Sequence, residues 1–317
     1  MNVRTTVVVV TWRGRDHVGA CLDALAAQTR PHRAIVVDNA STDGTAAVLA
    51  AHPSGPEVIR LPVNVGYAGA LAGVRPGTQY VAWLNDDAVP AADWLARMED
   101  ALDADPTAGA ASARLVSPSG EVQSVGVRLT DDGYGADTDS SPVFGFCGGA
   151  ALVRTAALAQ VGGVPGDFFC YYEDTDTSWR LRLAGWSVVA VPVEVAHLHG
   201  ASTEPGSAEF HLWNERNRLV TLLRCAPARV AIVQLARFAL LTAALPLLRR
   251  AKFKGSSVVP DAHNFRVGLR LRVLLQVGAR LPRALTTRVK IKLWAPDARA
   301  AVWREWSGRS RDMSGPG

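Results

Sequence analysis

The chain has 317 residues, of which 48% are hydrophobic, so it can bury a substantial core. Its four cysteines are widely spaced and include no C-x-x-C pair, so neither a disulfide framework nor a zinc knuckle is indicated, and a reducing compartment fits best. The net charge of +5 is unevenly distributed: residues 1–223 carry 15 Lys and Arg against 25 Asp and Glu, whereas residues 224–317 carry 19 against 4. We therefore expect an acidic part that holds a metal or cationic site, and a basic part that faces either nucleic acid or a membrane leaflet.

The first hundred residues alternate between strand-like and helix-like segments. In chain order, the sequence predicts strands at 6–10, 34–37, 58–61 and 80–84, and helices at 18–28, 45–51, 68–73 and 92–104. Such alternation is typical of a doubly wound α/β fold with a mostly parallel sheet. Because the first predicted strand begins almost at once, there is no room for a signal peptide, and we expect a cytoplasmic protein.

Polar residues follow three of these predicted strands directly. Thr11 ends the first, Asp38 and Asn39 end the second, and the triplet 85–87 (Asn-Asp-Asp) ends the run YVAWL. Ligand sites of open α/β sheets lie at the carboxyl ends of the strands. A carboxylate cluster at that edge, with more acids and histidines downstream, predicts an oxygen-rich metal site that holds a phosphorylated ligand.

Two common ways of holding a nucleotide are absent from the sequence. The first strand-to-helix turn reads Thr11-Trp12-Arg13-Gly14-Arg15 and lacks the G-x-G-x-x-G of a dinucleotide-binding fold. No G-x-x-x-x-G-K-S/T phosphate-binding loop occurs either. A nucleotide must therefore be bound by other means.

Five ordered blocks resemble the inverting nucleotide-sugar glycosyltransferases of family two, which have the GT-A fold. The blocks are VVVVTW, IVVDNASTDGT, NVGYAG, LNDDA, and FFCYYEDTDTSWRLRLAG followed by AHLHGAS, and the resemblance covers roughly residues 6–223. The resemblance implies a sheet with a nucleotide-binding half and an acceptor half. It also implies a catalytic domain over residues 1–225, leaving 226–317 as a basic, apolar helical region.

The resemblance assigns five residues to the donor nucleotide. Asp38 is expected to accept a hydrogen bond from the ring N–H of uracil or thymine, and Thr11 to touch the base through its backbone. Asn64 and Gly66 match the segment that lies against the ribose and diphosphate, and Arg216 matches a loop that grips a phosphate. From the residues alone, three other interpretations remain open. They are a helix-capping turn at Asp38, a plain turn at Asn64 and Gly66, and an amphipathic helix with a solvated face at Arg216.

A further group of residues matches the family's metal-binding positions. The triplet Asn85, Asp86 and Asp87 stands where the family has D-x-D, with asparagine in place of the first aspartate. Asp87 is the expected ligand of Mg²⁺ or Mn²⁺, together with His197 or His199, and Asn85 and Asp86 are expected near the donor. A solvated acidic loop and a structural histidine are the alternatives.

The pair Glu173 and Asp174 matches the family's E-D motif, in which the aspartate is the general base. Asp174 is thus expected to remove the proton from the acceptor hydroxyl, on the face of the sugar opposite the leaving nucleotide. Glu173 and Asp176 are expected to orient the acceptor or to cap a helix. Gly148 and Gly149 resemble the glycine-bearing floor of the acceptor pocket.

The basic tail contains two apolar patterns. Residues 230–248 resemble a transmembrane segment, but Gln234, Arg237 and Pro246 leave an unbroken apolar part that is too short to span a bilayer. From Val267 onward, apolar residues recur at helical spacing beside arginines. This favours a basic helix on an anionic membrane surface, although a helical subdomain packed on the catalytic domain fits as well.

Taken with the resemblance, the sequence predicts a metal-dependent inverting glycosyltransferase. The donor would be a UDP- or dTDP-sugar, such as dTDP-rhamnose, and the acceptor a glycan or polyprenyl-linked hydroxyl in cell-envelope polysaccharide synthesis. We expect a peripheral protein on the inner face of the cell membrane with no nucleic-acid partner, since no recognised nucleic-acid-binding motif is visible. The alternative is a non-catalytic polyanion- or sugar-binding protein with the same fold.

Overall fold

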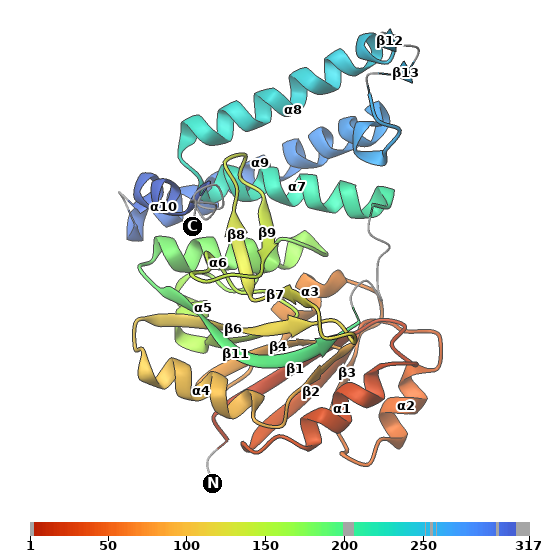
Figure 1. Ribbon diagram of the computed structural model, residues 1–317, viewed down its shortest axis with the longest axis vertical. Helices are drawn as coiled ribbons and strands as arrows, with labels where there is room; N and C mark the ends of the chain where they lie inside the picture. The colour runs from red at the N-terminus through yellow and green to blue at the C-terminus, as the bar shows by residue number, and fades with distance from the viewer. Residues whose placement is uncertain are drawn as a thin grey trace, which may run out of the picture.

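A computed structural model gives the arrangement of the chain. It describes residues 3–198, 206–250, 252–253, 256–257, 259–295 and 298–308, with the backbone alone for 252–253 and 256–257. Figure 1 shows a sheet flanked by helices in the lower part of the molecule and a stack of C-terminal helices above it. The N-terminus lies at the sheet end of the molecule, far from the C-terminal helices.

The N-terminal half has the predicted alternation of strands and helices. Its elements are β1 (Thr5–Thr11), α1 (Val18–Ala26), β2 (His32–Asp38), α2 (Thr45–Ala51), β3 (Glu57–Arg60), α3 (Gly66–Gly73) and β4 (Tyr80–Asn85). β1 pairs in parallel with both β2 and β4, and β2 pairs in parallel with β3. The predicted parallel α/β arrangement is therefore confirmed for this half.

The second half completes the sheet. Its elements are β5 (Ala88–Pro90), α4 (Trp94–Ala104), β6 (Ala108–Val116), β7 (Val122–Ser124), β8 (Gly126–Leu129), β9 (Gly135–Thr138), β10 (Ala150–Arg154), α5 (Thr155–Gln160), the 3₁₀ turn η1 (Gly166–Phe168), α6 (Glu173–Leu183) and β11 (Ser187–His197). The strand order is β3-β2-β1-β4-β10-β6-β11-β5, with β7 paired to β6. Within this sheet, β10, β5 and β7 run antiparallel to their neighbours and the other strands run parallel to one another, so the sheet is mostly parallel.

The alternation of side chains along β1 explains why helices cover both faces of the sheet. Val7 and Val9 are buried against α1 and α4 on one face, and Val8 and Val10 against α3, α5 and α6 on the other. A strand with apolar side chains on both faces must be central in a two-sided α/β sheet. Its carboxyl end, at Thr11, is thereby fixed at the middle of the sheet edge.

The C-terminal helices share a core with the part of the chain that contains the sheet. They are α7 (Ala208–Cys225), α8 (Ala228–Leu248), η2 (His263–Phe265), α9 (Val267–Trp294) and α10 (Ala298–Trp306), with the short strands β12 (Lys252–Phe253) and β13 (Ser256–Ser257) between α8 and η2. Phe144 lies 5.7 Å from Trp179 of α6 and 6.0 Å from Trp306 of α10, between ring centroids. Trp179 also stacks on Trp303 at 5.9 Å. The predicted division at residue 225 falls between α7 and α8, but it does not separate two cores.

Helix α8 is longer and more apolar than the sequence analysis expected. It has 21 residues and an 18-residue window of mean hydropathy 1.9, so by length and composition it is the helix in the described residues that could cross a membrane. A core helix of a soluble protein can pass the same test, but only 28% of this window is buried. Gln234 and Arg237 both bind the carboxylate of Asp132 on one side of the helix. Exposed apolar residues of α8 are Ile232, Val233, Leu240, Leu241 and Leu247.

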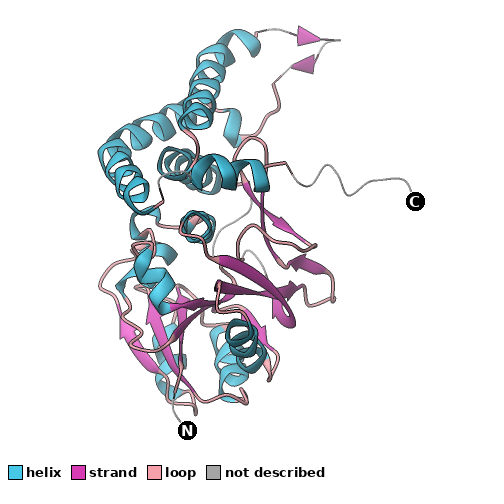
Figure 2. Cartoon of the chain, turned by 90° about the vertical axis from the view of Figure 1, so that its left-hand side faces the viewer, coloured by secondary structure: helices cyan, strands magenta, loops and turns pink. Residues whose placement is uncertain are grey.

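Figure 2 shows α8 at the top of the molecule, with the strands β12 and β13 beyond its end. One side of α8 packs on α7 and α9, and its buried residues include Phe238 and Leu245. α9 contributes a second exposed apolar series, in which Leu275 is 73% and Leu293 80% exposed. The packed side of α9 lies against α7 and includes the buried residues Val273 and Val277. The tail is thus both a packed subdomain and a surface rich in exposed leucine.

Candidate functional site

A cleft of about 770 Å³ opens at the carboxyl edge of the sheet. It lies between β4, β6, the start of α6, the β8–β9 hairpin and one side of α7. Its lining includes these predicted site residues: Asn85, Asp86, Asp87, Gly148, Gly149, Glu173, Asp174 and His197. Predicted site residues that are as far apart in the chain as Asn85 and His197 therefore face one cavity.

Asp38 and Thr11 lie side by side at the sheet edge but outside the lining of this cleft. They are register partners at the ends of β2 and β1, and both are fully buried. Asp38 Oδ1 accepts a hydrogen bond from the Ser41 N–H at 2.9 Å, whereas Oδ2 has no hydrogen-bond partner in the described chain and lies 3.7 Å from Arg60 Nε. A buried acceptor of this kind is suited to a ring N–H donor.

Asn64 and Gly66 belong to a network that fixes the loop before α3. The Asn39 side chain donates to Asn64 Oδ1 at 2.9 Å and accepts from the Val65 N–H, while Asn64 Oδ1 also accepts from the Gly66 N–H at 2.8 Å. Gly66 has φ +76°, and a Cβ there would lie 2.2 Å from the Phe169 carbonyl oxygen. Only glycine allows this approach. Neither Asn64 nor Gly66 lines the cleft, and the role of Asn39 was missed from the sequence.

Asp87 and His197 meet at one wall of the cleft. His197 Nε2 lies 3.3 Å from Asp87 Oδ1 and 3.1 Å from Asn85 Nδ2. The other ring nitrogen, Nδ1, donates to Gln123 Oε1 at 3.0 Å, which aims Nε2 at Asp87. Burial acts to raise the pKa of Asp87, but His197 and then His17 outweigh it, so the pKa lies below its ordinary value and the carboxylate stays ionised.

The neighbouring carboxylate, Asp86, faces a different histidine. Asp86 Oδ2 lies 3.2 Å from His17 Nε2, and this carboxylate raises the pKa of His17. A Cβ on Gly14 would lie 2.1 Å from Thr11 Oγ1 and 2.6 Å from Asp86 Oδ2, so only glycine fits at this point of the turn after β1. His17 and Gly14 carry no motif signal, and sequence reasoning did not find them.

The donor set around Asp87 fits a hard divalent cation that is completed by a ligand. Within the described residues, no group of three or more His, Cys, Asp or Glu side chains is placed to hold a metal ion unaided. Asp87 and His197 are one carboxylate and one imidazole, and Mg²⁺ is commonly bound by one or two carboxylates with substrate phosphates in the remaining positions. Imidazole is also a suitable ligand for Mn²⁺. The other candidate, His199, lies outside the described residues.

Asp174 lies across the cleft at the start of α6. Its Oδ2 accepts a hydrogen bond from the Gly148 N–H at 3.1 Å, and its Oδ1 accepts from the Thr175 N–H and hydroxyl at 2.5 and 3.1 Å. Burial raises the pKa of Asp174 despite these donors. Burial, followed by the charge of Asp174, raises the pKa of Glu173 to about 8, so Glu173 keeps its proton at pH 7. Burial therefore makes both carboxyl groups more basic than free carboxyl groups.

The floor of the cleft next to Asp174 has no side chain. A Cβ on Gly148 would lie 3.4 Å from Asp174 Cβ, and one on Gly149 would lie 3.0 Å from Leu115 Cδ1. The buried hydroxyl of Tyr67 donates to the Gly148 carbonyl at 2.9 Å and holds this floor in place. Tyr67 is another residue that sequence reasoning missed. The open floor leaves room for an acceptor beside the Asp174 carboxylate.

Asp176 does not reach the cleft. It lies two positions after Asp174, about 200° around α6, and its fully buried carboxylate pairs with Arg180 at 2.7 Å and Arg224 at 3.2 Å. Thr221 donates a further hydrogen bond to it. The geometry gives Asp176 a structural position between α6 and α7, in place of the predicted contact with the acceptor.

Arg216 is likewise placed away from the cleft. Its guanidinium is buried and donates to Asn217 Oδ1 at 2.8 Å, to Gln276 Oε1 at 3.0 Å and to the Phe168 carbonyl. These bonds join α7 to α9 and to η1. The guanidinium is thus engaged by the protein, and the predicted grip on a donor phosphate has no support in the geometry.

The fold and the site together define a GT-A glycosyltransferase. A mannosyltransferase from Pyrobaculum calidifontis, solved in complex with GDP-Man and Mn²⁺, matches with a TM-score of 0.51 and 19% identity, over 89% of this chain and 88% of that one. TarS 1-349 of S. aureus, solved in complex with UDP-GlcNAc, matches with a TM-score of 0.52 and 18% identity, over 96% and 93% of the two chains. These likenesses concern the fold, including the C-terminal helices.

The sequence comparison identifies the family. A model of glycosyl transferase family 2 matches residues 6–162. The N-acetylglucosaminyl-diphospho-decaprenol L-rhamnosyltransferases of two Mycobacterium tuberculosis strains, CDC 1551 and H37Rv, are 30% identical to this chain in an alignment of 243 positions. The alignment covers 63% of this chain and 78% of each relative. The chain belongs to glycosyltransferase family 2 and transfers a sugar from a nucleotide-sugar donor.

Proposed function

We propose that the protein is a metal-dependent, inverting glycosyltransferase that moves a sugar from a pyrimidine nucleotide-sugar to a hydroxyl of a lipid-linked glycan. The observation that carries this proposal is the cleft itself. One wall presents Asp87 and His197, and another presents Asp174, whose carboxylate is held by Gly148. Inversion requires a base on one side of the sugar and stabilisation of the leaving group on the other.

The residues of the cleft suggest how each part of the transfer is performed. Asp87 and His197 would hold a Mg²⁺ or Mn²⁺ ion, which supplies charge neutralisation on the diphosphate when bound. Gln123 fixes the ring of His197, so that Nε2 faces this position. Asp174 takes the proton of the acceptor hydroxyl at its carboxylate, and its raised pKa makes it a stronger base than an ordinary aspartate.

The donor is best described as a UDP- or dTDP-sugar. Asp38 Oδ2 is a buried acceptor without a hydrogen-bond partner in the described chain, as recognition of the N–H edge of uracil or thymine requires. The mycobacterial relatives are named as L-rhamnosyltransferases, and we therefore propose dTDP-rhamnose as the first donor to test. Their name also specifies an N-acetylglucosaminyl-diphospho-decaprenol acceptor. A polyprenyl-linked acceptor used in cell-envelope polysaccharide synthesis is the corresponding proposal here.

A thermal-shift screen tests the donor assignment. UDP-, dTDP- and GDP-sugars are each added with and without Mn²⁺, and the melting temperature is recorded. One pyrimidine nucleotide-sugar should raise the melting temperature by roughly 3–6 °C at about 100 times its Kd, and only with the metal present. A GDP-sugar that stabilises the protein better than any pyrimidine donor would contradict the proposed role of Asp38.

The exposed leucines of α8 and α9 support peripheral binding to an anionic membrane, on the inner face of the cell membrane. Replacing Leu240, Leu247 and Leu275 by serine should lower co-sedimentation with phosphatidylglycerol vesicles by about tenfold or more, because each exposed leucine contributes apolar surface to the bilayer interface. Val58 and Val63, which are exposed on the sheet half, form the matched control. An equal loss for the Val58→Ser/Val63→Ser control would contradict a membrane contact at these helices.

A further inference from the structure

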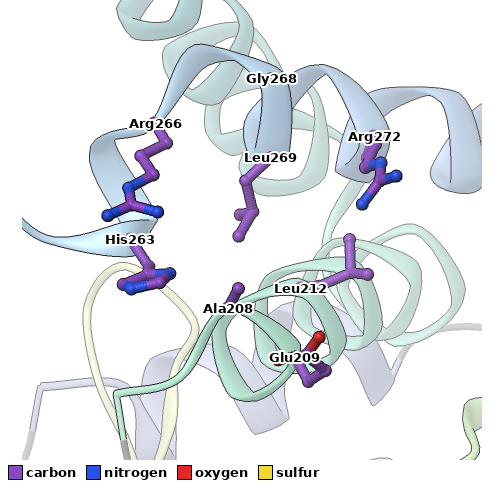
Figure 3. A pocket seen from close by; sticks show the side chains of 8 residues that line it. All are labelled: Ala208, Glu209, Leu212, His263, Arg266, Gly268, Leu269 and Arg272. Carbon is purple, nitrogen blue, oxygen red and sulfur yellow. The ribbon is translucent and has the colours of Figure 1, made fainter.

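A second cavity lies on the other side of α7 from the cleft. Its volume is about 470 Å³, and it lies between the first turns of α7 and the start of α9 (Figure 3). Its lining is Ala208, Glu209, Leu212, His263, Arg266, Gly268, Leu269 and Arg272. None of these residues belongs to the site described above. We call this cavity the α7–α9 pocket.

Positive charge dominates the polar part of the α7–α9 pocket. Figure 3 shows Arg266 and Arg272 on either side of Leu269, both extending toward α7. Neither guanidinium forms a hydrogen bond or ion pair with the described chain, and the buried Nδ1 of His263 also has no hydrogen-bond partner there. The one acid in the lining is Glu209. Two uncommitted guanidiniums suit a phosphate or diphosphate group, which they can bind through paired N–H donors.

The backbone adds to this preference for an anion. The pocket meets the N-terminus of α9, a helix of 28 residues whose N-cap position, Arg266, makes no side-chain capping hydrogen bond. The first N–H groups of a helix lack intrahelical partners and carry a partial positive charge. Gly268, in this first turn, presents backbone without a side chain to the pocket. The two arginines and the N-terminus of α9 therefore both place positive charge at the same pocket.

The remaining walls are apolar and lead to the exposed leucines of α9. Ala208, Leu212 and Leu269 form the apolar lining. With about 100° between successive residues, the order around α9 passes from Leu269 through Arg272 and Gly268 to exposed Leu275 and Leu271. An anionic head in the pocket could thus continue into an apolar chain along the outside of α9.

Helix α7 forms the wall between this pocket and the catalytic cleft. Phe210 and Asn214 line the cleft, whereas Ala208, Glu209 and Leu212 line the α7–α9 pocket. A helix with its side chains is about 10–12 Å across, so the two cavities are separated by roughly the length of one sugar and its diphosphate. A ligand of about this length that extends from one side of α7 to the other can therefore place a hydroxyl in the cleft and its phosphates in the pocket.

From this geometry we propose that the α7–α9 pocket binds the phosphate groups of the lipid-linked acceptor, and so selects acceptors that carry a prenyl diphosphate. The proposal rests on the proposed function for its acceptor class, but the binding of a prenyl diphosphate does not require sugar transfer. Bulk phospholipid headgroups share the phosphate chemistry. Acceptor diphosphate is favoured because the pocket lies across α7 from the catalytic cleft, whereas vesicle binding involves the whole exposed leucine surface.

The test uses farnesyl diphosphate as a soluble probe with the full-length protein. Titration calorimetry with the Arg266→Gln/Arg272→Gln variant should show a Kd raised by roughly 30-fold or more, because two charge-assisted contacts are lost. Arg229→Gln/Lys290→Gln removes two exposed charges from the same basic region and should leave the Kd unchanged. Glu209→Gln should tighten binding, since it removes the one negative charge of the lining. Inorganic pyrophosphate, which cannot use the apolar walls, should bind more weakly than farnesyl diphosphate.

The readouts separate this proposal from its alternatives. An unchanged Kd in Arg266→Gln/Arg272→Gln, or an equal loss in the control pair, would overturn it. Loss of phosphatidylglycerol vesicle binding in that variant, with farnesyl diphosphate binding intact, would assign the pocket to phospholipid heads and would also overturn it. The melting-temperature rise with donor and Mn²⁺ should be the same in both variants. If no donor raises it while farnesyl diphosphate binding depends on the two arginines, the proposed function fails and the pocket assignment stands.

Discussion

Replacing Asp174 by asparagine is expected to lower kcat by about 10³-fold while leaving the Kd of the donor nucleotide-sugar unchanged. The amide keeps the shape of the side chain but cannot accept the acceptor's proton, and general-base catalysis contributes roughly 10²–10⁴-fold. The hydrogen bonds of the Asp174 carboxylate in the described chain are to Gly148 and Thr175, and none is to Asp87 or His197. Steady-state kinetics together with donor-induced thermal shifts would measure the two effects separately.

The control for this variant is Asp139→Asn, which removes an exposed carboxylate from the loop that follows the β8–β9 hairpin. It should retain wild-type kcat. In the wild-type enzyme, kcat/KM should rise with pH as Asp174 loses its proton, and this rise should lie above the range of an ordinary aspartate because burial raises its pKa. A variant Asp174→Asn that turned over at more than a tenth of the wild-type rate would exclude this residue as the base.

Replacing Asp87 by alanine is expected to abolish the stabilisation that Mn²⁺ gives to the donor complex. The change removes the one carboxylate that lies beside His197 Nε2, at 3.3 Å, and the remaining imidazole cannot hold a hard cation on a diphosphate. The Kd of the nucleotide-sugar measured with Mn²⁺ should rise by at least about 100-fold, to the value found without metal. Titration calorimetry with and without Mn²⁺ would measure both values.

Asp93→Ala provides a matched control, because Asp93 is an exposed carboxylate a few residues further along the chain, with only a 3.8 Å contact to Arg97. It should bind donor and metal as the wild type does. If Asp87→Ala retained metal-dependent donor binding, the cation would have to be held elsewhere, and the assignment of Asp87 and His197 would be wrong. The folded state of each variant can be compared through its melting temperature without ligand.

The sheet and its helices could be predicted because their signals are local. Apolar runs such as that of β1, with capping and turn residues after them, place each element within a few residues of its observed bounds. The meeting of Asp87 with His197 could be predicted for a related reason. Asp87 follows the end of β4 by two residues and His197 ends β11, and the ends of strands that run in the same direction meet at one edge of a sheet.

Other parts of the site depend on contacts that no local pattern encodes. His17 reaches Asp86, and Gln123 orients His197, across 69 and 74 positions of the chain respectively. The two misplaced residues, Asp176 and Arg216, were assigned by motif alone. Their positions on α6 and α7 direct them into the interior, where buried partners hold them. The motifs thus identified the segments that form the site. Whether a residue in such a segment faces the cleft or the interior depends on the side of the helix on which it lies.

The core shared by α6, α9, α10 and the β8 region restricts how this enzyme can be divided. Trp306 lies near the end of the described chain, yet it packs on Phe144 and on Arg182, whose guanidinium carbon is 4.2 Å from the Trp306 ring centroid. The catalytic half therefore lacks an independent interior on this side. The tail is therefore not an interchangeable unit: replacing α10 would also require new packing partners for Phe144, Trp179 and Arg182.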